Sequence, residues 1–170
     1  MPKTGKAAIV SAPAPAGKPV ATRKPPAKKA ALCDIADTLY RVALDACKEH
    51  RRYAELVKWK GSDSEQKAAR SAVRTCDEVL DEAVDLYEVA CLGESNHADD
   101  AWWHRANMVW RTAREYLTRH TASDRLTRGG NDHRRAELVE LSIEYELEAS
   151  AILRLRHAVD SYKAARPEAG

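Results

Sequence analysis

The sequence predicts an all-α protein, an antiparallel up-down-up-down four-helix bundle, and three observations support this prediction. Six of the seven prolines lie in the first 26 residues and the seventh is Pro167, so nothing from Ala27 to Arg166 forbids a helix. Few glycines interrupt this region, and they divide it into four segments. Within each segment apolar residues recur at steps of three and four, which is the spacing of one helix face.

The glycines mark the expected helix ends, because glycine readily adopts the left-handed conformation that terminates a helix. Gly61, Gly93 and the pair Gly129 and Gly130 are each followed by Ser, Asp or Asn residues that can cap the next helix. The predicted helices are about 31–60, 64–92, 96–120 and 132–165. The segment 121–131 either extends the third helix or forms a loop.

An apolar seam is predicted along each helix, and two of these seams bear on the arguments below. In the second helix the seam is Ala69, Ala72, Cys76, Val79, Ala83, Leu86 and Ala90. In the fourth helix it is Leu138, Leu141, Tyr145, Glu148, Ile152, Leu155 and Val159. Glu148 is the exception in this series, and a buried carboxylate needs a partner. We expect a buried ion pair between Glu148 and Arg111 or Arg114 of the third helix.

The N-terminal segment differs sharply in composition from the rest of the chain. Residues 1–30 contain seven Lys and Arg residues and no acid, together with many Ala and Pro residues. Such a segment has too few large apolar side chains to fold, so it is predicted to be disordered. The expected organisation is therefore a basic tail at 1–30, a bundle at 31–166 and a short C-terminal end at 167–170.

Three of the four tryptophans fall within the stretch WWHRANMVW, residues 102–110. At about 100° per residue, Trp102 and Trp110 lie within the apolar arc of the third helix, while the nearby arginines fall outside it or at its edge. A stacking platform for nucleic acid would mix aromatic and cationic side chains on one surface. We therefore expect core packing, with Trp103 beside Arg114 as the remaining surface candidate.

The four cysteines form two level pairs if the first two helices are antiparallel neighbours. Cys47 then lies level with Cys76, and Cys33 with Cys91, about 21 Å further along the hairpin. Buried thiols are the first interpretation, and disulfides within the two pairs are the second. A third is a zinc site formed by Cys47, His50 and Cys76 with a fourth ligand. No cofactor is expected otherwise.

The charge pattern leaves a nucleic-acid partner open as an alternative. The basic tail and the arginine-rich span from Arg105 to Arg135 offer cations for a phosphate backbone. The candidate binding residues are Lys18, Arg23, Lys24, Lys28, Lys29, Trp103, Arg114, Arg119, Arg125, Arg128, Arg134 and Arg135.

The fourth helix carries a second apolar stripe, Val139, Ile143 and Leu147, which predicts packing against another copy of the chain. No phosphate-binding glycine loop or catalytic triad spacing is present, so enzymatic activity is not expected. Nor does any apolar run reach the length of a membrane span. The leading hypothesis is a cytoplasmic, self-associating interaction protein with a basic arm. A nucleic-acid accessory protein is second, and a metal-binding or redox bundle is third.

Overall fold

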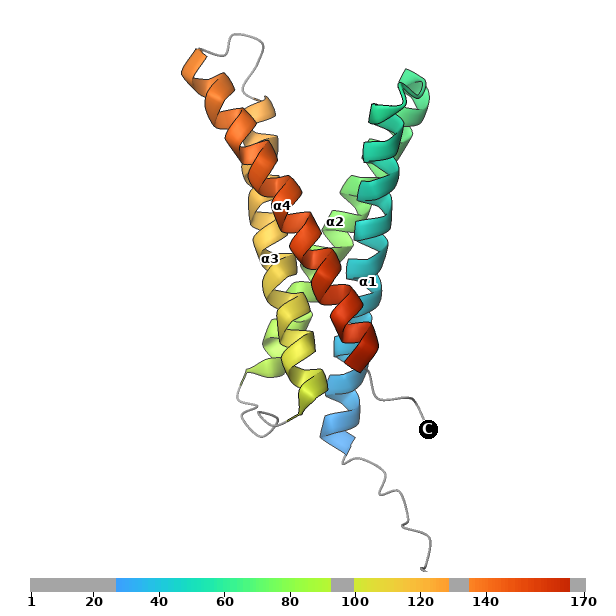
Figure 1. Cartoon of the computed structure of the whole chain (residues 1–170). Coiled ribbons are helices and arrows are strands. Elements are labelled where there is room, and N and C mark those ends of the chain that lie inside the picture. The colour runs from blue at the N-terminus through green and yellow to red at the C-terminus, as the bar shows by residue number, and fades with distance from the viewer. Residues whose placement is uncertain (1–26, 93–99, 129–134, 166–170) are drawn as a thin grey trace, which may run out of the picture.

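The computed structural model describes residues 27–92, 100–128 and 135–165 and contains four helices. They are α1 (Ala27–Lys58), α2 (Asp63–Cys91), α3 (Ala101–Arg128) and α4 (Arg135–Ala165), and consecutive helices run antiparallel (Figure 1). The described ranges contain no strand, so the predicted all-α four-helix arrangement is confirmed. No helix in them has the length and hydrophobicity of a transmembrane segment. Residues 1–26 of the predicted basic tail lie outside the described residues.

Two helix boundaries differ from those expected. Helix α1 begins at Ala27, so the last four residues of the predicted tail are helical. Helix α3 continues to Arg128, which means that most of the segment 121–131 extends the helix. The extension has a packed face, because Ser123 is buried and Leu126 is half-buried.

The turn between α1 and α2 is closed by two capping motifs. Lys60 has a φ of 53°, and the amides of Lys60 and Gly61 donate to the carbonyls of Val57 and Leu56 at 3.3 and 2.8 Å. This is a Schellman C-cap, with the left-handed residue at Lys60 rather than at the expected Gly61. Helix α2 then begins with a capping box between Ser62 and Glu65.

The helices form two hairpins, α1 with α2 and α3 with α4, that meet along only half of their length. Figure 1 shows the hairpins crossing at the end that holds the start of α1 and diverging toward the α1–α2 turn. We call the opening between the diverging halves the fork; residues 50–58 of α1 and 145–156 of α4 line its wider side. Residues 51–74 form the α1–α2 arm, and residues 119–128 and 135–148 lie in the α3–α4 arm (Figure 1).

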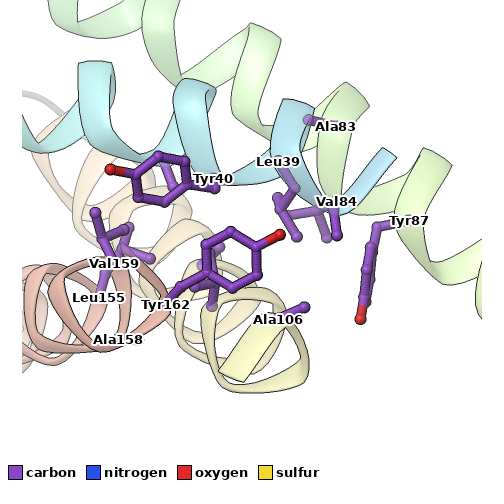
Figure 2. Packing of buried hydrophobic residues seen from close by; sticks show 14 of the residues in the cluster. Leu39, Tyr40, Ala83, Val84, Tyr87, Ala106, Leu155, Ala158, Val159 and Tyr162 are labelled. Carbon is purple, nitrogen blue, oxygen red and sulfur yellow. The ribbon is translucent and has the colours of Figure 1, made fainter. Parts of the chain in front are cut away.

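The core lies where the hairpins cross. Tyr87, Tyr162, Leu39 and Leu155 are among the most deeply buried side chains (Figure 2). Tyr116 is equally buried. Small residues accompany them and allow the helices to approach closely: Ala43, Ala46, Ala113 and Ala151 have no exposed surface. Large side chains in contact with alanines from all four helices thus fix how the two hairpins cross.

The buried face of α2 differs from the predicted seam. Val79 and Leu86 of that seam are exposed, whereas Leu80 and Tyr87 are buried. Ala69 and Ala83 of the predicted seam are buried as expected, but the other buried residues each follow a predicted position by one residue, which is about 100° around the helix. The displacement matters for function, because it brings Asp77 to the inside.

Candidate functional site at the fork

Five polar side chains from all four helices meet at the closed end of the fork. They are His50 of α1, Asp77 of α2, Tyr116 and His120 of α3, and Glu148 of α4, and we call them the polar cluster. Each occupies a position where its helix leaves the apolar core and begins to diverge. The polar cluster therefore connects the two hairpins at the level where apolar contacts between them end.

Asp77 is the centre of the polar cluster and is only 6% exposed. The Tyr116 hydroxyl donates to its Oδ2 at 2.9 Å, and His120 Nε2 lies 3.4 Å from the same oxygen. His50 Nε2 lies 3.4 Å from Oδ1 and is also hydrogen-bonded to the Tyr116 oxygen. Because the single Tyr116 proton goes to Asp77, we assign His50 Nε2–H as the donor to Tyr116. Asp77 thus accepts one hydrogen bond, from Tyr116, and has two imidazole nitrogens at 3.4 Å, while its Oδ1 has no hydrogen-bond donor.

Glu148 and His120 form the second half of the polar cluster. His120 Nδ1 lies 2.8 Å from Glu148 Oε1. This hydrogen bond raises the pKa of His120 above its ordinary value, although burial acts in the opposite direction. Burial raises the pKa of Glu148, but the hydrogen bonds and the positive charge of His120 outweigh it and hold the pKa below its ordinary value. Both shifts favour the charged pair.

Tyr116 stays neutral in this environment. Burial, followed by the negative charge of Asp77, raises the pKa of its hydroxyl far above the ordinary value. A neutral phenol keeps its proton and can act as a hydrogen-bond donor to Asp77. Tyr116 is therefore a fixed donor, whereas the pKa of His120 is raised above 6.5 and the pKa of Glu148 is lowered below 4.5.

Of the cavities that border the polar cluster, two lie within the fork. The smaller, of about 150 Å³, lies among all four helices and is lined by polar groups that include His120, Asp124 and Arg70. The larger, of about 730 Å³, lies between α1 and α4. Its lining is mostly apolar, with Val57 and Leu153 on opposite sides. The fork therefore has polar side chains at its closed end and mostly apolar side chains along its α1 and α4 sides.

Both predicted partners of Glu148 are wrong: its carboxylate contacts His120, whereas Arg111 is exposed and Arg114 pairs with Glu88. Residue 111 is nine positions from residue 120, a separation of about 13.5 Å along α3, so the Arg111 side chain lies at a different level from Glu148. Burial of Glu148 itself was expected, and the structure places its carboxylate largely inside.

The structure distinguishes between the interpretations of the four cysteines. All four cysteines are thiols, so neither the Cys33–Cys91 pair nor the Cys47–Cys76 pair forms a disulfide. Cys47 lines the larger cavity beside α4, whereas Cys76 is not part of that lining. Burial raises the pKa of the Cys47 thiol to about 11, so it is protonated at neutral pH.

The zinc ligands suggested by the sequence do not come together. Among the residues that the structure describes, no three His, Cys, Asp or Glu side chains form a group that could hold a metal ion. His50 faces Asp77 and Tyr116, and Cys47 and Cys76 lie outside the polar cluster.

The candidate arginine surface is largely engaged within the protein. Arg114 forms an ion pair with Glu88 of α2 and places its guanidinium 5.8 Å from the ring centroid of Trp110, rather than beside Trp103. Arg119 pairs with Glu144 at 3.4 Å. Trp103 is half-buried against Tyr87, while Arg125 is exposed. The side chains of the remaining candidates lie outside the described residues: Lys18, Arg23, Lys24, Lys28, Lys29, Arg128, Arg134 and Arg135.

The second apolar stripe of α4 is on the surface, as predicted for an interface. Val139 and Ile143 are exposed, and Leu147 is half-buried. The predicted core seam of this helix is wrong at Leu138 and Tyr145, which are exposed where α4 diverges from the α1–α2 hairpin (Figure 1). Tyr145 and Leu153 are exposed apolar residues on its fork side.

Asp77, Tyr116 and His120 were missed by the sequence reasoning. The available signal was a charged residue, Asp77, within the series that includes Val73, Leu80 and Val84. Comparisons with protein-family models, curated proteins and solved structures found no match to this chain.

Proposed function

We propose that this protein is a non-enzymatic interaction protein that self-associates, with an arm of a second copy occupying the fork. The observation that carries the proposal is the larger cavity, which is open between α1 and α4 and has exposed apolar side chains on both walls. Val57 lies on the α1 side, and Tyr145 and Leu153 lie on the α4 side; they are 47%, 48% and 58% exposed.

The energetic argument is hydrophobic. Fully burying a large apolar side chain contributes about 1.5–3 kcal/mol, and contiguous exposed apolar surface marks interaction sites. The crossing core fixes the divergence of the hairpins, so the two walls are too far apart to cover one another within one chain. A helical segment from outside is a suitable occupant, because an amphipathic helix buries an apolar face in a groove.

The opposite charges of the two arms favour a second copy as that occupant. Residues 51–74 of the α1–α2 arm contain seven Lys and Arg residues against three acids. Residues 138–153 of α4 contain four acids and no Lys or Arg. When two copies interlock with twofold symmetry, each acidic α4 segment lies against the basic arm of the other copy. The same contact is then made twice, as in an isologous dimer.

The test is the mass of the full chain in solution, measured by size-exclusion chromatography with light scattering. Leu153→Glu introduces a charge into the wall of the fork, and we expect it to convert a dimer into a monomer. Leu86→Glu is the matched control, because Leu86 is 52% exposed on α2 and does not line either cavity. It should leave the dimer intact. Equal masses for Leu153→Glu and the wild type would contradict the proposal.

A further inference from the structure

The turn between α1 and α2 presents an aromatic side chain between two cations. Trp59 is 76% exposed, the largest exposed fraction among the large apolar residues in the described ranges. Lys58 precedes it, with Nζ 5.3 Å from the ring centroid, and Lys60 follows it. The Schellman cap at Lys60 and Gly61 fixes the local backbone, so the ring is held at the end of the arm rather than on a loose loop.

We propose that this turn binds single-stranded nucleic acid, with an unpaired base stacked on Trp59 and the phosphates held by the surrounding cations. The site differs from the arginine-rich span and adjoins the fork, because Lys58 lines the larger cavity and Arg70 and Arg74 line the smaller one. Base stacking on an exposed aromatic side chain combined with a cationic path for the backbone is how sequence-independent single-strand binding is built.

The cations around the turn lack acidic partners. No acid of the described residues lies within 4.0 Å of the charged nitrogens of five cations on this arm: Lys58, Lys60, Lys67, Arg70 and Arg74. Two of the three acids of this arm are used locally, since Glu55 pairs with Arg51 and Glu65 caps α2 through Ser62; the third, Asp63, is exposed in the first turn of α2. The turn therefore carries excess positive charge that a phosphate backbone can neutralise.

The arrangement of these cations extends away from Trp59 along α2. Lys67, Arg70 and Arg74 are spaced by three and four residues, so they share one face of the helix. On the other arm, by contrast, Arg119 is paired with Glu144. If a base at one end of the strand stacks on Trp59, the phosphates that follow it can lie along this row of unpaired cations.

The experiment measures binding of the full chain to a fluorescently labelled oligothymidylate by fluorescence anisotropy over a range of salt concentrations. Trp59→Ala removes the stacking surface, and we expect affinity to fall by about tenfold. Trp59→Tyr should retain most of the affinity, because tyrosine also stacks. Both variants should keep the wild-type circular dichroism spectrum, since the Trp59 ring is on the surface.

The salt dependence of binding distinguishes phosphate contacts made by the α1–α2 arm from those made by the basic tail. Lys60→Ala should reduce the slope of log affinity against log salt concentration by about 0.7, the value for one phosphate contact on a single strand. Lys163→Ala, an exposed cation in the last turn of α4, should leave the slope unchanged.

Three results would overturn the inference. One is equal oligothymidylate binding by Trp59→Ala and the wild type. Another is Trp59-dependent binding to phosphatidylserine vesicles without binding to the oligonucleotide, which would assign the turn to a lipid surface. The third is a change of solution mass in Trp59→Ala with unchanged oligonucleotide affinity, which would place the turn in the dimer interface.

Discussion

Tyr116 of α3 donates a hydrogen bond of 2.9 Å to Asp77 of α2 and thereby joins the two hairpins through buried polar groups. A buried carboxylate is costly unless donors surround it, so Asp77 favours the arrangement that brings Tyr116, His50 and His120 to it. The polar cluster therefore specifies how the hairpins meet, and apolar contacts supply most of the stability. The divergence of the fork follows from this crossing.

Replacement of Tyr116 by Phe is predicted to destabilise the protein. The ring still fills its place, but Asp77 loses a donor in a buried site, which costs about 1–3 kcal/mol. Urea unfolding monitored by circular dichroism measures the change. Tyr145→Phe is the control, because the Tyr145 hydroxyl bonds to exposed Thr127 and its loss should have a small effect. A loss of stability in Tyr145→Phe as large as in Tyr116→Phe would contradict the role given to Asp77.

Stability is predicted to depend on pH through His120 and Glu148. The pKa of His120 is raised above 6.5, so its contribution is fully present below pH 6.5 and is lost as pH rises through the folded-state pKa. The pKa of Glu148 lies below 4.5, so its contribution is present above pH 4.5 and is lost as pH falls through the folded-state pKa. The pair therefore stabilises the fold most between about pH 4.5 and 6.5.

The measurement is the free energy of unfolding in urea across a pH series for the wild type and for His120→Gln. The difference between the two proteins should be largest in that interval and should shrink on both sides. A difference that is constant with pH would show that His120 and Glu148 do not act as a charged pair.

Enlarging a fully buried alanine where the helices cross is predicted to weaken the fold. Ala113 has no exposed surface, so Ala113→Leu forces the helices apart or distorts neighbouring rotamers at a cost of about 1–3 kcal/mol. Ala68→Leu on the exposed side of α2 should cost much less. Urea midpoints compare the two variants, and equal midpoints would argue against close packing at Ala113.

The Cys47 thiol is predicted to resist alkylation. Burial raises its pKa to about 11, so very little reactive thiolate exists at neutral pH. Iodoacetamide labelling of the native protein followed by peptide mass spectrometry should find Cys47 mostly unmodified, while the unfolded protein labels at all four cysteines. Rapid labelling of Cys47 in the native state would contradict its burial.

The sequence was sufficient to predict the helices and their antiparallel order, because proline, glycine and apolar periodicity act locally. It also singled out Glu148 as a carboxylate in an apolar seam. The partner of Glu148 was missed because the α3 residue that lies level with Glu148 depends on where α3 ends. The sequence left open whether the segment 121–131 extends this helix or forms a loop. Asp77 was missed because the buried face of α2 is displaced by one residue, a choice that tertiary packing makes. Local pattern thus predicted the elements, and packing between the hairpins created the polar cluster.

The most direct test of the central claim is sedimentation velocity of the wild-type full chain over a concentration series. If arms of two copies occupy each other's fork, the mass should approach twice 18.9 kDa as concentration rises. A mass of 18.9 kDa at every concentration would contradict self-association through the fork.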